Sequence, residues 1–346
     1  MLELQEQRYK NGEKHLSAFG MNKLLTPLKG EAEYSWLNEV SNASLKCVCN
    51  DLHEAYGNYF NKKRKHPKFK SRKHSKLSYP VRFDRFYFQN TRAVIEKVGK
   101  VKYKTDFNLP QGRGHKFSNP RISYINDKWM LSFGIECENQ ARELTDKPMG
   151  IDLGVKDLAV VAYGDEKLVF HNINKSKKVK ELNKRLVHLQ RDISRKYDAN
   201  RKGNAYIKTN NIMKQEEKLR KLHAHIANIR LNYIHQTTHQ LVELLPKRVV
   251  MEDLNVSGMM KNKHLSKAIS EQCFYEFIRQ MKYKCEWNGI EFIQADRFYP
   301  SSKTCSCCGC IKPDLKLFDR TYICNECGTV IDRDYNAALN LSKYVA

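Results

Sequence analysis

Six of the eleven cysteines lie in one short segment, between Cys305 and Cys327. In this segment Cys305 and Cys308 form one C-x-x-C pair, and Cys324 and Cys327 form a second pair after fifteen intervening residues. Thiolates at this spacing are typical ligands of Zn²⁺, and each pair supplies two corners of a tetrahedron. Because four thiolates leave no open coordination position, we expect one zinc ion with a structural role.

The first pair of zinc ligands has an alternative in the sequence. Cys307 and Cys310 have the same internal spacing as Cys305 and Cys308. A glycine directly follows Cys308, as one follows the last cysteine of the distal pair, and a small residue there lets backbone N–H groups approach the sulfur. The glycine favours Cys305 and Cys308 and leaves open a contribution from Cys307 or Cys310.

Three acidic residues that are far apart in the sequence could form a second metal site. Asp152 interrupts the apolar run 149–155, Glu252 ends the apolar run 249–251, and Asp334 stands where a helix is expected to begin. A carboxylate in an apolar strand is costly unless it is paired or binds a cation. Together, three carboxylates could hold two Mg²⁺ or Mn²⁺ ions, which activate water and stabilise the leaving oxygen of a phosphodiester. We therefore predict a catalytic metal site.

The chain is strongly basic, with 62 Lys and Arg against 38 Asp and Glu and a net charge of +24. Such an excess favours a polyanionic partner, most often nucleic acid. Basic residues concentrate in the segment 61–76, which contains no acid and includes Arg72 and Lys73. A solvated linker is the alternative interpretation of this segment. The predicted phosphate contacts are Lys62, Lys63, Arg64, Lys65, Lys68 and Lys70.

Composition excludes two classes of protein. No apolar run approaches the roughly 18 residues of a membrane-spanning helix. A chain of 346 residues that is rich in lysine and has no visible signal peptide does not fit a secreted disulfide scaffold. We therefore expect a cytoplasmic protein with no membrane partner.

Hydrophobic periodicity predicts the elements that position these residues, in a mixed α/β protein. The region 79–137 has short strands separated by turns, the pattern of a small β-barrel or curled sheet. The expected helices are 31–60, a long hairpin over 174–245 with a bend near Gly203, 269–288, and 335–344. The other expected strands lie within 149–170, 248–254 and 290–295.

The order of the motifs resembles the TnpB family, insertion-sequence proteins that are also called OrfB transposases and are related to type V CRISPR effector nucleases. The resemblance is carried by four blocks, which are 150–154 (GIDLG), 250–255 (VMEDLN), 301–305 (SSKTC) with the two CxxCG pairs, and 332–340 (DRDYNAALN). It covers residues 148–343 most fully and extends, with fewer matches, over 31–137.

The resemblance implies an RNase H-like RuvC nuclease domain with a zinc-ribbon insertion, preceded by a helical region and a small β-barrel. It implies that Asp152, Glu252 and Asp334 are the three RuvC acids. It also implies an RNA-guided DNA endonuclease with a DNA target and a guide RNA from the transposon end. The expected domains are a helical recognition-like region with the basic segment (1–78), an oligonucleotide-binding-like barrel (79–147), the RuvC-like domain (148–300), the zinc ribbon (301–331) and a final RuvC segment (332–346).

One departure from the family pattern keeps an alternative function open. Family members usually begin with a short strand of basic and aromatic residues, whereas this sequence starts within an expected helix. We therefore expect that strand to be absent. The alternative is a non-cutting nucleic-acid-binding regulator of transposition, or a truncated inactive copy. A transposase that joins strands itself is disfavoured, because no Tyr- or His-based motif of that kind is present.

Overall fold

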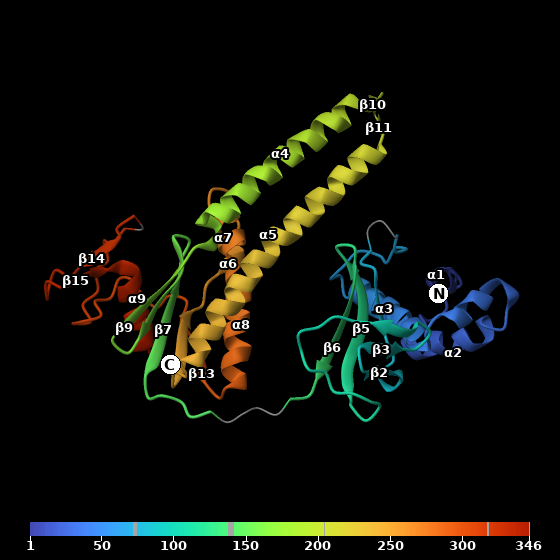
Figure 1. Cartoon of the computed structure of the whole chain (residues 1–346), viewed down its shortest axis with the longest axis horizontal. Helices are drawn as coiled ribbons and strands as arrows, with labels where there is room; N and C mark the ends of the chain where they lie inside the picture. Colours follow the sequence, from blue (N-terminus) through green and yellow to red (C-terminus); the bar gives the residue numbers. More distant parts are fainter. Residues whose placement is uncertain (72–74, 138–141, 204, 317, 346) are drawn as a thin grey trace. The chain divides into compact units, whose positions relative to one another are not determined.

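The computed structural model describes the whole chain except residues 72–74, 138–141, 204, 317 and 346, so the basic residues Arg72 and Lys73 lie outside the described part. The chain divides into two compact units, Met1–Glu138 and Asn139–Ala346, and the fold is mixed α/β (Figure 1). Within the described residues, no helix combines the length and apolarity needed to cross a membrane.

The first unit begins with four helical elements, which are α1 (Leu2–Lys10), α2 (Ala18–Leu28), the 3-10 helix η1 (Ala32–Glu39) and α3 (Asn42–Phe60). The expected helix over 31–60 is therefore interrupted. Val40 and Ser41 are extended, and the Ser41 hydroxyl accepts a hydrogen bond from the Ala43 N–H at 3.3 Å. A serine that caps a helix in this way marks the start of a new helix, here α3. The apolar periodicity of the sequence continues across this break and therefore does not reveal it.

Two three-stranded antiparallel sheets follow in the first unit and share one apolar core. One sheet has the order β1 (Ser78–Pro80), β5 (Phe117–Ile125), β6 (Lys128–Ile135), and the other β2 (Phe86–Gln89), β3 (Arg92–Ile95), β4 (Gly99–Lys102), with the 3-10 turn η2 (Phe83–Arg85) before β2. Phe86, Phe88, Phe117 and Phe133 meet in the core with ring centroids 5.0 to 5.6 Å apart. Burial alternates along β2 and β3, which places every second side chain on the face that packs against the rings.

The second unit is built on a five-stranded mixed sheet in the order β13-β12-β7-β8-β9. Its strands are β7 (Pro148–Leu153), β8 (Asp157–Tyr163), β9 (Glu166–His171), β12 (Arg248–Glu252) and β13 (Glu291–Ala295). β12 runs parallel to β7 and β13, and β8 runs antiparallel to β7 and β9. Because side chains alternate between the two faces of a strand, Met149 and Ile151 point to the opposite face from Gly150 and Asp152.

Helices cover both faces of this sheet (Figure 1). On one face, α5 and α8 contribute Ile234, Leu241, Phe277 and Met281 to the main core around Met149, Ile151, Val249 and Met251. On the other face, α9 packs on β7, β8 and β12. The helices are α4 (Lys177–Ala199), α5 (Asn210–Glu243), α6 (Val256–Met259), α7 (Ser266–Gln272), α8 (Phe274–Trp287) and α9 (Arg333–Ser342), with the 3-10 turn η3 (Ile173–Lys175) before α4.

The long helical hairpin expected over 174–245 is present as α4 and α5. A two-stranded ribbon, β10 (Arg201–Lys202) and β11 (Ala205–Tyr206), joins the two helices at their far ends (Figure 1). Near the carboxyl end, β14 (Thr321–Ile323) and β15 (Val330–Asp332) form a short antiparallel pair.

The prediction of a single helix over 269–288 is wrong, because the structure has two helices there. Cys273 adopts a left-handed backbone conformation with φ of +54°, which ends α7 and begins α8. Apolar periodicity continues through this residue, so the pattern does not reveal the break. The break allows the buried Gln272 side chain to donate a hydrogen bond to the carbonyl of Gly154 at 2.9 Å, just after β7.

Gly150 allows α9 to lie directly on β7. A Cβ atom added at this position would overlap the Ala338 carbonyl oxygen and the Ser342 backbone nitrogen of α9. Leu341 of the same helix is fully buried against Val250 and its neighbours on this face. The missing side chain therefore sets the separation of sheet and helix, and with it the position of the first turn of α9.

Gly150→Ala is expected to destabilise the protein by about 1–3 kcal/mol, because backbone atoms cannot move aside as a flexible side chain would. Urea unfolding measures the change. Gly57→Ala is the control: Gly57 lies in α3 with open space around it, so alanine is expected to stabilise by up to about 1 kcal/mol. A Gly150→Ala protein as stable as the wild type would contradict the close contact.

Candidate functional site

Asp152, Glu252 and Asp334 converge on one face of the five-stranded sheet. Asp152 lies near the end of β7 and Glu252 is the last residue of β12. The register pairs Met251 with Ile151, so Glu252 lies one step further on, beside Asp152. Ile151 and Met251 fill the core on the opposite face, which turns both carboxylates toward α9. Asp334 lies in the first turn of α9.

The charges of the three acids influence one another. Burial raises the pKa of Asp152 well above its usual range, and the negative charges of Glu252 and Asp334 raise it further. The positive charge of Arg333 acts in the opposite direction. The negative charges of Glu252 and Asp334 thus disfavour the ionised form of Asp152. A divalent cation bound between such carboxylates would balance their charge. This donor set of carboxylate oxygens fits Mg²⁺ or Mn²⁺.

Polar side chains hold two of these acids. The Ser301 hydroxyl donates a hydrogen bond to the Glu252 carboxylate. Asp334 accepts a hydrogen bond from Arg333 Nη2 at 3.0 Å, and its other oxygen lies 3.9 Å from Arg320 Nη1. The sequence pattern gives no sign of the Ser301 and Arg320 contacts, because they join residues that are distant in the chain, whereas Arg333 is the sequence neighbour of Asp334.

The three carboxylates are spaced more widely than the ligands of a single ion. Among the described residues, the ligand atoms of three or more His, Cys, Asp or Glu side chains come within 4.8 Å of one another only at four cysteines.

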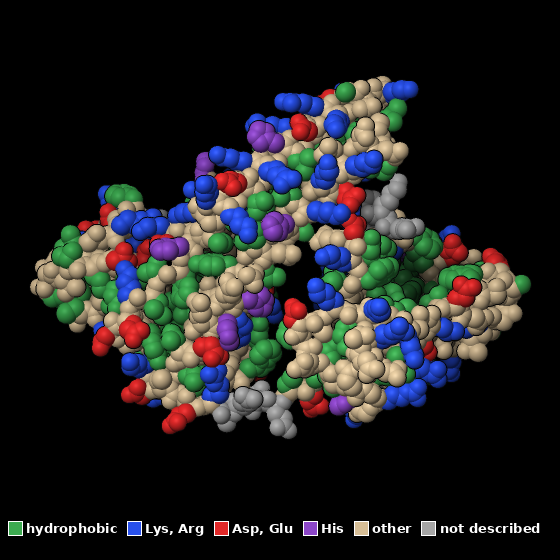
Figure 2. Space-filling model, in the orientation of Figure 1, with side chains coloured by type: hydrophobic (Ala, Val, Ile, Leu, Met, Phe, Trp, Pro, Cys, Tyr) green, Lys and Arg blue, Asp and Glu red, His purple; other side chains and the backbone are tan. Residues whose placement is uncertain are grey.

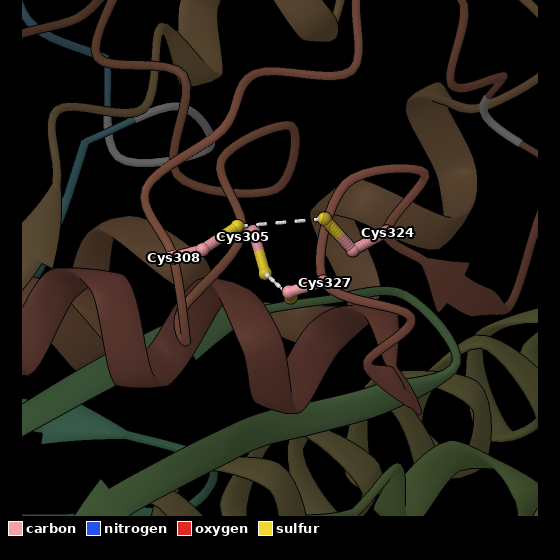
Figure 3. Close-up of side chains that lie close together, drawn as sticks. All are labelled: Cys305, Cys308, Cys324 and Cys327. Carbon is pink, nitrogen blue, oxygen red and sulfur yellow. Dashed lines mark hydrogen bonds between the residues drawn. The ribbon is translucent and has the colours of Figure 1, made fainter.

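The sulfurs of Cys305, Cys308, Cys324 and Cys327 form that four-cysteine group (Figure 3). The Sγ atoms of Cys305 and Cys327 are 3.6 Å apart, and those of Cys308 and Cys324 are 3.5 Å apart. A disulfide bond is about 2.05 Å long. Four sulfurs around Zn²⁺, each about 2.3 Å from the ion, lie roughly 3.8 Å from one another. The donor set and its spacing therefore fit zinc.

The two cysteine pairs have the same backbone geometry. The Gly309 N–H donates to the carbonyl of Cys305 at 2.9 Å, and the Gly328 N–H donates to the carbonyl of Cys324 at 3.2 Å. Both glycines have positive φ, +77° and +72°, which other residues rarely adopt. Each pair thus forms a tight turn that presents two sulfurs on one side.

The alternative ligands Cys307 and Cys310 lie outside the four-sulfur group, within the part of the chain that the structure describes. The Cys307 side chain is exposed, and the Cys310 thiol lies against the carbonyl of Ile311 at 4.0 Å.

Hydrogen bonds from the hydroxyl and N–H of Thr329 lower the pKa of Cys327 to about 6, which favours the thiolate that a metal binds.

Two asparagines of α9 attach the cysteine segment to the sheet. The Asn336 amide donates to the carbonyl of Thr304 at 2.7 Å, and its oxygen accepts from the Ser306 N–H at 2.9 Å. The Asn340 amide donates to the carbonyl of Ser301 at 2.7 Å. Both side chains are buried, and their spacing of four residues on one helix face is the sequence signal that could have identified them. One helix thus positions both Asp334 and the cysteine segment.

The predicted phosphate contacts lie directly after α3 on the surface of the first unit. Within the described residues 61–71, one ion pair is present, between Lys70 and Asp51 at 3.2 Å. The other cations are exposed and have no acidic partner among the residues that the structure describes, and these are Lys62, Lys63, Arg64, Lys65 and Lys68. Cations without acidic partners can contact phosphates at no loss of an internal ion pair.

Comparison with known proteins identifies the family. Residues 132–263 match the family model OrfB_IS605, described as "Probable transposase", and residues 274–341 match "Cas12f1-like, TNB domain". A Streptomyces pristinaespiralis protein named "Putative RNA-guided DNA endonuclease" is 32% identical over 322 residues, which cover 92% of this chain and 75% of that protein. The chain belongs to the TnpB family. An Escherichia coli (strain K12) protein named "Putative RNA-guided DNA endonuclease InsQ" is 30% identical over 356 residues, and the match covers 97% of this chain and 83% of the InsQ chain.

A solved structure of low sequence identity shares the fold. It is the Cas12f1 protein in a cryo-EM complex with sgRNA and target DNA, which superimposes with a TM-score of 0.59 at 16% identity and covers 87% of this chain and 70% of that one. At this identity the likeness concerns the fold alone. The mixed α/β class expected from the periodicity of the sequence is confirmed.

Cys324→Ser is expected to remove zinc from the protein, because three thiolates and one hydroxyl bind the ion much less tightly than four thiolates. Elemental analysis of the purified wild type is expected to give about one zinc per chain. Cys307→Ser, the matched control from the same segment, should leave the zinc content unchanged. Retention of zinc by Cys324→Ser, or its loss from Cys307→Ser, would show that the ligand set is different.

Proposed function

We propose that the chain is a transposon-encoded RNA-guided DNA endonuclease that hydrolyses phosphodiester bonds in a RuvC-like site. The observation that carries this proposal is the convergence of Asp152, Glu252 and Asp334 on one face of the sheet. Family membership supports it, because two relatives that match most of this chain are named as RNA-guided DNA endonucleases.

In this proposal the three carboxylates hold two Mg²⁺ or Mn²⁺ ions. When bound, such ions activate the attacking water and neutralise the charge that develops on the leaving oxygen. Ser301 fixes the orientation of the Glu252 carboxylate through its hydrogen bond. The packing of α9 on β7 fixes the position of Asp334 relative to Asp152. Arg320 and Arg333 offset the negative charge of Asp334.

The proposed domains follow the same assignment. Residues 148–300 and 332–346 would form the RuvC-like domain, and 301–331 the zinc ribbon with one structural Zn²⁺. Residues 1–78 would form a helical recognition-like region, and 79–147 an oligonucleotide-binding-like barrel. The two curled sheets around the phenylalanine core support the last assignment.

The proposed partners are a DNA target and a guide RNA from the transposon end. A positively charged surface supports them, because phosphate contacts supply most of the affinity of non-specific nucleic-acid binding. Helix α4 carries eight Lys and Arg against three Asp and Glu. Figure 2 shows Lys and Arg side chains along the helical hairpin, which would add to the basic segment after α3.

Asp152→Ala, Glu252→Ala and Asp334→Ala should each lower DNA cleavage by about 10³-fold or more and leave DNA and RNA affinity nearly unchanged. Ligands that act as a unit are not additive, whereas Lys and Arg contacts hold the substrate. The assay is plasmid cleavage in Mg²⁺ with copurified guide RNA, with EDTA as the metal-free reference. Asp165→Ala, an exposed acid in a turn of the second unit, is the matched control and should cut normally.

Two outcomes of this assay would overturn the proposal. Cleavage by Asp152→Ala at the wild-type rate would exclude the assignment of the acids. A wild-type protein that binds guide RNA and target DNA but never cuts would instead be a nucleic-acid-binding regulator.

Replacing Lys62, Lys63, Arg64 and Lys65 with alanine should weaken nucleic-acid binding and flatten its dependence on salt. Each lost phosphate contact lowers the slope of log affinity against log salt by about 0.9 for duplex DNA and about 0.7 for single strands. The measurement is a series of binding titrations at increasing salt. A variant that exchanges Lys for Arg and Arg for Lys at the same positions keeps the charge and should keep the slope. An unchanged slope in the alanine variant would identify the segment as a linker.

A further inference from the structure

A cavity of about 430 Å³ lies in the first unit, among α1, the end of α3 and the segment that follows it. This volume is in the range of small-molecule sites, about 300–1,000 Å³. Six of its ten lining residues carry rings, and these are Tyr9, His15, Tyr56, Tyr59, Phe60 and His66. No residue of the proposed metal sites contributes to it.

The rings in this wall contact one another mainly through tilted and edge-to-face geometries. His15 and Tyr56 have centroids 4.6 Å apart, and His66 lies edge-on to Tyr56 at 5.5 Å and to Tyr59 at 5.1 Å. Several of these rings remain open to solvent, since Tyr9 is 79%, Tyr59 39% and Phe60 54% exposed. Exposed aromatic faces beside a cavity provide stacking surfaces for a flat, apolar ring.

Among the described residues, two buried polar atoms that belong to lining residues have no hydrogen-bond partner. They are the Tyr56 hydroxyl, on a side chain only 5% exposed, and Nε2 of His15. Burial and the nearby His53 lower the pKa of His15, so its ring is neutral near pH 7 and offers either a donor or an acceptor. A buried polar group without a partner is costly. Both atoms are closed off from the cavity as the rings lie, so a ligand with a flat face and a polar edge would reach them after a rotation of the two rings.

The positive charge near this cavity lies mainly outside it, in the basic segment after α3. After α3, Lys62 adopts a left-handed backbone, and the N–H groups of Lys63 and Arg64 both bond the carbonyl of Asn58. The chain therefore folds back and brings His66 onto the wall, so that Lys62–Lys65 lie next to the cavity along the chain. The wall itself carries Glu6, Glu13 and Lys10, and Glu13 is paired with Arg8 at 2.6 Å, so the lining is less positive than the basic segment outside it.

We propose that this cavity binds an unpaired nucleobase of the strand whose phosphates contact the basic segment after α3. The base would stack on the exposed rings, and a rotation of the Tyr56 and His15 rings would bring their unpartnered polar atoms to its edge. This inference rests on the nucleic-acid binding of the proposed function, but it requires no cleavage. RNA and DNA both carry such a base, so the two sources are separated by experiment.

Binding of the full-length chain to single-stranded decamers tests the proposal by fluorescence anisotropy. RNA and DNA decamers are compared with a DNA decamer of abasic residues. Wild type should bind the abasic decamer roughly tenfold more weakly than at least one base-bearing decamer, because stacking is lost. The stronger of the RNA and DNA arms identifies the source of the base.

Tyr56→Phe removes only the unpartnered hydroxyl. It should weaken binding of the base-bearing decamer about three- to tenfold and leave both the abasic decamer and the salt slope unchanged. Its melting temperature should be equal to or above that of the wild type, because an unsatisfied buried group is lost. A purely structural role of the hydroxyl would lower the melting temperature instead.

Tyr163→Phe is the matched control, because the Tyr163 hydroxyl donates to the carbonyl of Leu244 at 3.0 Å in the second unit. It should lower stability and leave discrimination between base-bearing and abasic decamers intact. Three results would overturn the proposal. They are equal wild-type affinity for both kinds of decamer, no binding of either decamer, and a Tyr56→Phe protein that binds the base-bearing decamer as tightly as the wild type does. If wild type discriminates but never cuts DNA, the endonuclease proposal fails and the base pocket stands.

Discussion

The contact between the backbones of α9 and β7 at Gly150 is the constraint on which the site depends. It places a helix directly on the strand that carries Asp152, so that Asp334 in the first turn of that helix comes close to Asp152 and Glu252. Three carboxylates brought together in this way repel one another, and the favourable packing of Leu341 and its neighbours must offset that repulsion. In our account, bound divalent cations convert the repulsion into a binding site.

The cysteine segment depends on the same helix. Its apolar core is small, with Cys305, Tyr322 and Cys324 as its buried members, and its strands β14 and β15 are three residues each. A segment of this kind gains most of its stability from a metal ion. Asn336 and Asn340 connect it to α9, and Arg320 extends from it toward Asp334. The proposed zinc ion would therefore support the position of an arginine beside the acidic site.

Local patterns in the sequence predicted a large part of this architecture. The C-x-x-C pairs identified the four sulfurs that meet, since ligand spacing and the following glycines are local properties. Acids in two apolar strands and at a helix start predicted the three carboxylates that lie near one another. The helical hairpin followed from periodicity over a long segment. The division of the helix at Cys273 could not be predicted, because a single left-handed residue leaves the apolar period unchanged. The contacts of Ser301 and Arg320, and the meeting of His15 with Tyr56, join residues distant in the chain and follow from tertiary packing alone.

The central claim is that the carboxylates of Asp152, Glu252 and Asp334 bind a pair of divalent cations. Anomalous X-ray diffraction from crystals of the protein grown with Mn²⁺ tests it most directly, because manganese positions are then located independently of the protein atoms. The account predicts two manganese peaks about 3.5–4 Å apart between these three carboxylates. Crystals in Mn²⁺ that show no peak there, with Asp334 still bound to Arg333, would contradict it.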